Sequence, residues 1–440
     1  MKTVAWKFEK EIPVIFDVDV AVLGGGPGGL GAAVMSAKAG AKTLLIERYS
    51  MLGGMASVGE VSPFMPNHYK DGSSFDRPVY TRWVQQMNSY LPEEIRSKIP
   101  AGDNAENGLT RTIGKEIAAL AAEDLCIEAG VKLLYHHKLC GASVKKGKID
   151  FIVLDSKSGF VAVRAKNFVD CSGDADLAAV SGCEFELGDA EGHCQPMTLC
   201  FKLSHVRREL MPNWEAFQKL YKDGQQSGAL SCPRENVLYF AHHDEDVIHF
   251  NTTRVQGKSA VDGIELSDAE VEARKQLREY IIWLRASVPG FEQAQLHSMG
   301  AHIGVRETRR VKGLAYLTRE DFVKRSKFPD AISRCNYPID IHCPTPGKSG
   351  TELVHMESSE YYEIPYGCVV AKDISNLTIG GRPISVDHAI HSSMRVMPPA
   401  CTVGQAAGLA AALSSQRNCS PAKLDGCEVR KKLVEMGAYL

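Results

Sequence analysis

The sequence predicts an α/β protein in which a parallel β-sheet carries a β-meander and is joined to a second, α+β domain. Three patterns support this fold class. An apolar strand pattern at residues 17–23 runs into a glycine-rich turn and an alanine-rich helix. Short alternating runs within residues 140–163 are separated by hairpin-turn sequences. Residues 186–362 then show a different mixture of short strands and helices, before the glycine- and alanine-rich pattern returns at residues 363–440.

Composition excludes several classes of protein. The chain has 440 residues, of which 44% are hydrophobic and 24% charged, so it can bury a large core and is not disordered as a whole. Its 51 Lys and Arg residues nearly balance its 53 Asp and Glu residues, for a net charge of −2. This balance offers no basic surface for nucleic acid or for an anionic membrane.

Targeting and cysteine patterns lead us to expect a cytoplasmic protein without a metal site. Residues 1–16 lack the apolar block of a signal peptide. None of the 13 cysteines forms a C-x-x-C pair, and the run His242 to Asp246 lacks the spacing of a metal site. The uncharged stretches 20–37 and 396–416 contain glycine and proline, which favours close-packed core over a membrane span.

The first strand opens a nucleotide-binding pattern. It is followed by Gly24-Gly25-Gly26-Pro27-Gly28-Gly29, an expected helix at residues 30–39 and a second strand at residues 42–46 that ends at Glu47. Strand, G-x-G-x-x-G, helix, strand and acid together predict a Rossmann-like dinucleotide-binding unit.

Each position of this unit has a physical role. Gly24 allows the tight turn, Gly26 lets the backbone approach a pyrophosphate, and Gly29 lets the helix pack closely on the strand. The helix N-terminus offers free N–H groups to the phosphates. Glu47 is placed to accept hydrogen bonds from a ribose hydroxyl, which argues against NADP but leaves NAD and FAD open.

Further glycine motifs carry a family resemblance. Leu52-Gly53-Gly54-Met55 follows the acid, a strand at residues 376–382 ends in glycines, and an alanine-rich helix is expected to open at Gly404-Gln405. The closer matches are Asp170–Asp174, Gly304–Arg310 and Gly380–Ser385. In this order, from residue 17 to the C-terminus, the motifs resemble the FAD-dependent oxidoreductase family. These are two-dinucleotide-binding flavoproteins distantly related to fumarate reductase flavoprotein and glutathione reductase.

The resemblance implies that the cofactor is FAD. The meander agrees, because a meander within the sheet is what the FAD-type fold adds to the NAD-type one. The resemblance also places the helix opening at Gly404 beside the flavin. No histidine follows Gly54 closely, so we expect non-covalent FAD. The residues expected to hold it are Gly24, Gly25, Gly26, Pro27, Gly28, Gly29, Glu47, Arg48, Gly53, Gly54, Met55, Ser172, Gly173, Asp174, Gly381, Gly404 and Gln405.

The remaining elements divide the chain into domains. The FAD-binding domain is expected to comprise residues 17–65, 110–185 and 363–440, with the substrate domain at residues 186–362. The elements expected between 110 and 185 are a helix at 112–129, a strand at 131–135, meander strands at 140–144, 149–154 and 160–163, and a return strand at 167–171. Those expected in the substrate domain are strands at 198–203, 237–239 and 247–250, helices opened by Ser267 and Thr318, and a mobile loop or lid at 341–352.

Arginine and histidine side chains are the candidates for catalysis. Arg306 and Arg382 suit recognition of a carboxylate or phosphate, with Arg309, Arg310 and Arg395 as further cations. The alternative for Arg306 is an internal ion pair with Glu307. His388 and His391 are candidate acid–base groups beside the flavin, as is His302, and the alternative for each is a structural hydrogen bond.

These features favour a flavoenzyme that transfers a hydride between flavin N5 and a small polar substrate, anionic or polyhydroxylated. Two alternatives stay open: a flavin-dependent lyase or isomerase without net redox, and a non-catalytic dinucleotide-binding sensor. The electron donor or acceptor is unknown from sequence. A homodimer is the default expectation, with no nucleic-acid or membrane partner.

Overall fold

The main sheet confirms the predicted α/β class. The computed structural model describes residue 4, residues 11–96 and residues 114–440. Within that part of the chain a seven-stranded sheet has the order β3-β2-β1-β6-β5-β4, and β17 pairs with β6. Its strands are β1 Val14–Leu23, β2 Thr43–Ile46, β3 Lys132–Leu134, β4 Lys138–Lys145, β5 Lys148–Ser156, β6 Gly159–Asp170 and β17 Leu377–Ile379. Strands β3, β2, β1, β6 and β17 run parallel, whereas β4, β5 and β6 form the antiparallel meander.

Strand β6 differs from the prediction of two separate strands at 160–163 and 167–171. It is continuous over its 12 residues, because the exposed Arg164 and Lys166 interrupt the apolar pattern without ending the strand. Its first half pairs with β5 and its second half pairs with β17. One strand therefore joins the meander to the parallel sheet.

Helices pack against the main sheet through close backbone contacts. The helices of this part are α1 Pro27–Lys38, α2 Val79–Ser89, α3 Glu93–Arg96, α4 Lys115–Glu128, α5 Asp176–Val180, α8 Arg319–Lys324, α9 His388–Met394, α10 Met397–Arg417 and α11 Gly426–Glu435. Helix α4 confirms the helix expected at 112–129, the start of which lies outside the described residues. Helices α1 and α10 touch through glycine: a Cβ on Gly31 would lie 2.1 Å from the Cys401 oxygen, and one on Gly408 would lie 2.1 Å from the Ala32 oxygen.

Helix α10 begins well before the predicted opening at Gly404, so that prediction was wrong. Its first residue is Met397. Pro398 and Pro399 fit in the first turn, because the N–H groups that proline lacks would have no partner within the helix there. Gly404 and Gln405 are consequently wholly buried within the helix. No single helix of the described part is long and apolar enough to cross a membrane, although α9 and α10, bent by 100°, pass together on length and composition.

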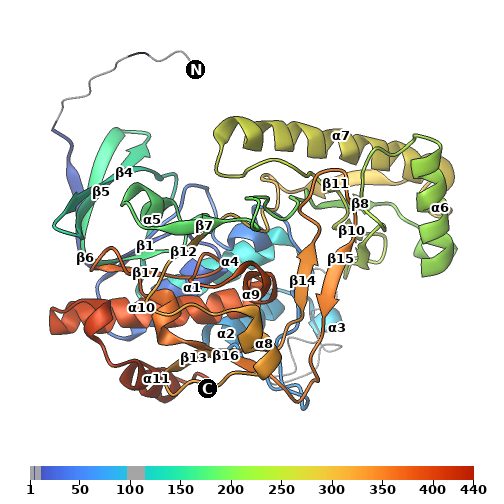
Figure 1. Ribbon diagram of the computed structural model, residues 1–440. Helices are drawn as coiled ribbons and strands as arrows, with labels where there is room; N and C mark the ends of the chain where they lie inside the picture. The colour runs from blue at the N-terminus through green and yellow to red at the C-terminus, as the bar shows by residue number, and fades with distance from the viewer. Residues whose placement is uncertain (1–3, 5–10, 97–113) are drawn as a thin grey trace.

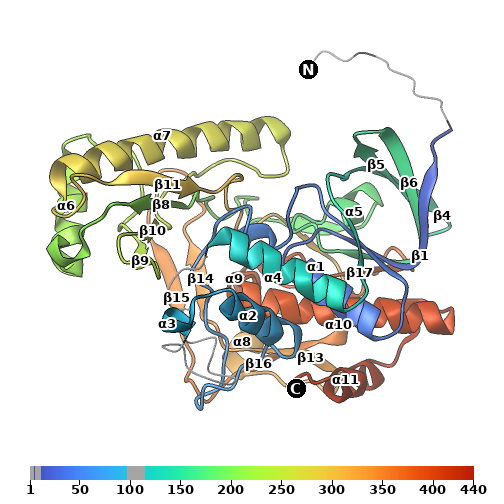
Figure 2. The same ribbon diagram turned by 180° about the vertical axis from the view of Figure 1, so that it is seen from behind.

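A second, separate hydrophobic core lies at the other end of the molecule from the β4–β5 hairpin (Figure 1, Figure 2). Its sheet has the order β11-β8-β10-β9, covered by two helices. These elements are β8 Phe201–Ser204, α6 Trp214–Gln226, β9 Tyr239–Ala241, β10 Ile248–Phe250, α7 Gly263–Ser287 and β11 Gln295–Met299. Helix α7 starts earlier than the Ser267 capping box predicted, because the Asp262 carboxylate already accepts the N–H groups of Ile264 and Glu265.

Residues after β11 return to the first core. Buried side chains from Val311 to Ile364 pack with those of the main sheet, whereas the second core ends at Val305. The elements here are β12 Arg309–Val311, which pairs with β7 Phe185–Leu187, then β13 Ala331–Cys335, β14 Ile339–His342, β15 Thr351–Val354 and β16 Tyr362–Pro365. Helix α8 has the capping box predicted at Thr318. The predicted domain limits at 186 and 362 stay a prediction.

The loop predicted at 341–352 is the connection of a β-hairpin. Strands β14 and β15 pair at its two ends, and residues 343–350 between them lie outside both strands. The hairpin reaches from the first core toward β9 and β10 (Figure 1). The Gln256 amide donates to the carbonyl oxygens of Cys343, Thr345 and Lys348 and so attaches the turn to the second core. A lid function of the hairpin stays a prediction.

Replacing Gly404 by alanine tests the backbone contact between α1 and α10. The new Cβ would lie 2.0 Å from the Gly28 carbonyl oxygen, so one helix must shift. We expect the Gly404→Ala variant to lose about 1–3 kcal/mol of unfolding free energy, measured by thermal or denaturant unfolding. The control is Gly263→Ala in helix α7, where a Cβ meets nothing within 4 Å. Equal stability of the two variants would contradict the contact.

Candidate functional site

A cavity of about 660 Å³ lies where the two cores meet. One side is formed by the carboxyl ends of β1 and β2, at Leu23-Gly24 and Ile46-Glu47. The opposite side comes from the second core and from the β14–β15 hairpin. The carboxyl ends of strands in an open α/β sheet are the usual place for a ligand.

The glycine turn after β1 opens into this cavity. Gly24 has φ +95°, a conformation that favours glycine, and Gly24, Gly26, Pro27 and Gly28 all line the cavity. A Cβ on Gly26 would be in ordinary van der Waals contact with the Gly54 Cα at 3.8 Å, so the backbone there is not crowded where it borders the cavity. Gly29 has another role, because a Cβ there would lie 1.7 Å from the Gly24 oxygen. The turn thus presents backbone of the α1 N-terminus to the cavity.

Glu47 ties the glycine turn to the second strand. Its Oε2 accepts the Gly25 N–H at 2.6 Å, and its Oε1 accepts the Tyr49 N–H at 2.9 Å. The carboxylate is buried and lines the cavity together with Arg48. Its role toward a ribose stays a prediction.

The second glycine pair lies against the first. Gly53 and Gly54 have φ +98° and +52°, and the Gly53 N–H donates to the Gly25 oxygen at 2.8 Å. A Cβ on Gly54 would lie 2.7 Å from the Gly26 Cα. Gly54 and Met55 line the cavity, so the structure brings together two segments that the sequence predicted to share a ligand.

The Ser172-Gly173-Asp174 segment lines the cavity and is held by arginines. Arg382 forms an ion pair with Asp174, and Arg309 donates to the Asp174 carbonyl at 2.8 Å and to Asp176 at 3.1 Å. Burial raises the pKa of Asp170, just before this segment, to about 6. Arg382 lines the cavity, but its guanidinium is engaged with a carboxylate of the protein.

The N-terminus of α10 contributes Val396, Met397 and Ala400 to the cavity wall. Gly404 and Gln405 do not line the cavity. The Gln405 amide instead accepts the Val79 N–H at 2.7 Å and donates to the Arg77 oxygen at 3.0 Å. The start of α10 at Met397 explains this displacement, since the predicted residues lie further along the helix.

Arg306 lines the cavity and does not pair with Glu307. Its Nη1 donates to the Pro196 oxygen and the Thr198 hydroxyl, each at 2.6 Å. The buried Glu307 carboxylate contacts Arg310 at 2.5 Å and the His388 Nδ1 at 2.8 Å. The internal ion pair that we considered for Arg306 is thus formed by Arg310.

Neither His388 nor His391 lines the cavity. His391 is wholly buried, and both of its ring nitrogens lack a hydrogen-bond partner among the described residues. Burial, with help from Arg310, lowers its pKa well below the usual value. His302 does line the cavity, and its Nδ1 contacts the Ile303 oxygen at 2.6 Å.

Sequence reasoning missed the polar wall made by Arg234, Tyr337, Asp340 and His342, which all line the cavity. A signal was present, because Asp340 and His342 alternate along one short strand and so share a face. The predicted residues that line the cavity are Gly24, Gly26, Pro27, Gly28, Glu47, Arg48, Gly54, Met55, Ser172, Gly173, Asp174, His302, Arg306, Arg309, Gly381, Arg382 and Arg395. Those that do not are Gly25, Gly29, Gly53, Arg310, His388, His391, Gly404 and Gln405.

Curated relatives share part of this chain. Over 161 residues it is 32% identical to a digeranylgeranylglycerophospholipid reductase of Thermoplasma acidophilum, a match that covers 35% of this chain and 39% of the relative. Over 171 residues it is 30% identical to a thiamine thiazole synthase of Methanococcus aeolicus, covering 37% and 57%. The matches thus span less than two thirds of the relatives' length.

A solved structure, described as geranylgeranyl bacteriochlorophyll reductase-like and from Thermoplasma acidophilum, aligns with a TM-score of 0.48 at 14% identity, covering 96% of this chain and 84% of that one. The model of a family described as FAD dependent oxidoreductase matches residues 19–433, nearly the whole chain. The match extends from within β1 to within helix α11 and includes the motifs that line the cavity. The chain belongs to the FAD-dependent oxidoreductase family.

Proposed function

We propose that this protein transfers a hydride between a small anionic or polyhydroxylated substrate and a non-covalently held FAD. The observation that supports this proposal is that one cavity has both kinds of surface. This cavity joins the glycine turns of the nucleotide-binding motif to a polar wall that contains Arg306. A nucleotide cofactor and a polar substrate therefore have adjoining surfaces.

The residues present fit FAD. The backbone at Gly26 borders the cavity uncrowded at the N-terminus of α1, which suits a pyrophosphate. Glu47 lies at the end of β2, where a ribose hydroxyl is bound in such units. Residues 55–58 contain no histidine for a covalent bond, in keeping with non-covalent attachment. When bound, FAD supplies the two-electron chemistry.

The polar wall offers groups that bind and orient a substrate. The Nη1 of Arg306 donates hydrogen bonds to Pro196 and Thr198 of the protein. The planar guanidinium has further N–H donors that can bind a carboxylate. The Tyr337 hydroxyl lies 3.3 Å from the Asp340 Oδ2, and burial raises its pKa, so it keeps its proton at neutral pH. Tyr337 is thus our candidate for holding a proton near the substrate.

Flavin content tests the phosphate-binding turn. Purified protein should show a flavin absorption spectrum, and acid precipitation should release FAD into the supernatant. We expect Gly26→Val to lower FAD affinity about tenfold or more, because the side chain would fill the space open to the phosphates. The control is Gly141→Val in β4, where a Cβ meets nothing within 4 Å. Full FAD occupancy in Gly26→Val would contradict the assignment.

Anaerobic reduction separates the redox function from the lyase alternative. Organic acids and sugar acids are screened for bleaching of the flavin band without an external acceptor. The proposal predicts bleaching with one product molecule per flavin, because the electrons have nowhere else to go. Many turnovers without bleaching would instead favour a lyase or isomerase. Failure of every donor to reduce the flavin would favour the sensor.

A further inference from the structure

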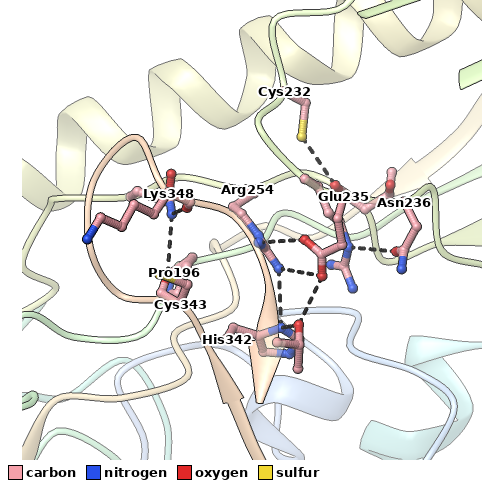
Figure 3. A network of polar contacts seen from close by, with 12 residues as sticks. Pro196, Cys232, Glu235, Asn236, Arg254, His342, Cys343 and Lys348 are labelled. Carbon is pink, nitrogen blue, oxygen red and sulfur yellow. Dashed lines mark hydrogen bonds and ion pairs between the residues drawn. The ribbon is translucent and has the colours of Figure 1, made fainter. Parts of the chain in front are cut away.

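Four arginines gather at the end of the cavity formed by the second core and the β14–β15 hairpin. Arg234, Arg306 and Arg395 line the cavity, and Arg254 lies beside them against Glu235 and His342 (Figure 3). They come from four separate segments of the chain, so this cluster is a product of the fold. We call these residues the arginine cluster.

Two of the four arginines are neutralised by the protein. The Arg254 Nη1 lies 2.8 Å from the Glu235 Oε2, and the Arg395 Nη2 lies 3.3 Å from the Asp340 Oδ2. Glu235 also accepts a hydrogen bond from the Thr351 hydroxyl at 2.9 Å, which fixes the carboxylate to the hairpin. Glu235 and Asp340, the two carboxylates at this end of the cavity, are therefore each paired with an arginine.

The other two arginines have neutral partners. Arg234 donates to the Asn251 carbonyl at 3.0 Å and to the Asn236 side chain at 3.3 Å, and Arg306 donates to a carbonyl and a hydroxyl. Within the part of the chain that the structure describes, no carboxylate lies within 4.0 Å of either guanidinium. The four arginines face two carboxylates, so this end of the cavity carries two excess positive charges.

His342 adds no charge to this balance. Burial lowers its pKa well below the usual value, and the neighbouring arginines, Arg306 first among them, act in the same direction. The Arg254 Nη2 lies 3.2 Å from the His342 Nδ1 (Figure 3). The His342 Nε2 lies 3.6 Å from the Asp340 Oδ1. The neutral ring links the two ion pairs.

Two unpaired positive charges inside a protein are unfavourable, because the arginines lose their hydration and repel one another. A bound anion would offset both effects. Arg234 is only 4% exposed and Arg306 is half-buried, yet both border the cavity. A ligand in the cavity is thus the available source of negative charge.

We propose that the arginine cluster is a subsite for a dianionic substrate, a small dicarboxylic acid with one carboxylate for each of Arg234 and Arg306. This inference rests on the proposed function and names its substrate class. Arginine favours carboxylates because its planar fork can donate two parallel hydrogen bonds to one carboxylate. Asn236 and Asn251, which also line the cavity, offer neutral hydrogen-bonding groups to the rest of the molecule.

The cluster is separate from the nucleotide-binding turns. The turns follow β1 and β2, whereas Arg234 precedes β9 and Arg306 follows β11. Gln256 and Arg254 attach the hairpin to the second core, so the wall that carries Asp340 and His342 is held in place before a ligand arrives. A preformed wall lowers the cost of ordering these side chains on binding.

Calorimetric titration of the FAD-loaded protein tests the subsite. The probes are succinate, butyrate of the same chain length with a single carboxylate, and inorganic phosphate, at constant ionic strength. We expect succinate to bind about tenfold or more tightly than butyrate, because only succinate can neutralise both guanidiniums. Preference for phosphate over succinate, or equal binding of succinate and butyrate, would overturn the proposal.

Charge-removing variants identify the groups. We expect Arg234→Gln and Arg306→Gln each to weaken succinate binding about 30-fold or more and to remove the preference over butyrate. The matched control is Arg285→Gln, at an exposed position near the end of α7, where the guanidinium donates to the Ala294 carbonyl and succinate affinity should not change. Unchanged succinate binding in both cavity variants would overturn the proposal.

Flavin absorbance of the same samples keeps this inference apart from the proposed function. If the wild-type protein holds FAD but does not bind succinate, the subsite is wrong and the flavoenzyme assignment stands. If it never holds FAD, the proposed function fails. If Arg306→Gln lowers FAD affinity and leaves succinate binding unchanged, the excess charge serves the cofactor, and the dicarboxylate proposal is refuted.

Discussion

The contact between helices α1 and α10 is the constraint on which the site depends. Glycine at positions 31, 404 and 408 lets the two backbones approach to distances that no Cβ would allow. This approach sets the N-terminus of α10 beside the glycine turn that opens α1, although the two helices are far apart in the sequence. Both helix N-termini therefore border one cavity. Helix α1 offers backbone N–H groups there, whereas Pro398 and Pro399 remove two such donors from the first turn of α10.

The site divides into two electrostatic regions. At the glycine turns the protein offers mainly backbone, with Glu47 already bound to two N–H groups. At the opposite end the protein offers side-chain charge, and the balance there is positive. Backbone donors suit phosphates of any nucleotide, whereas placed guanidiniums discriminate among substrates. Under the proposed function, the glycine turns would hold the cofactor and the arginine cluster would select the substrate.

Local pattern predicted the fold well where neighbouring residues decide the conformation. The βαβ unit, the meander and α4 follow from apolar periodicity and turn residues, and the structure confirms them. Predictions failed where two signals competed. Helix α10 starts before Gly404 because proline is allowed in its first turn. Helix α7 starts before Ser267 because Asp262 already caps its N-terminus. Strand β6 continues through exposed Arg164 and Lys166 because it has partners on both sides.

The sequence by itself determined the nucleotide-binding unit, because its glycines, helix and acid act within one short stretch of chain. It could not determine which charges remain unpaired. Arg306 is adjacent to Glu307 in sequence, yet Glu307 pairs with Arg310 and Arg306 turns to the cavity. His388 and His391 were equally good candidates by position, but the fold places them outside the cavity. Only tertiary structure decides such pairings, since ion pairs depend on distance in space rather than on separation along the chain.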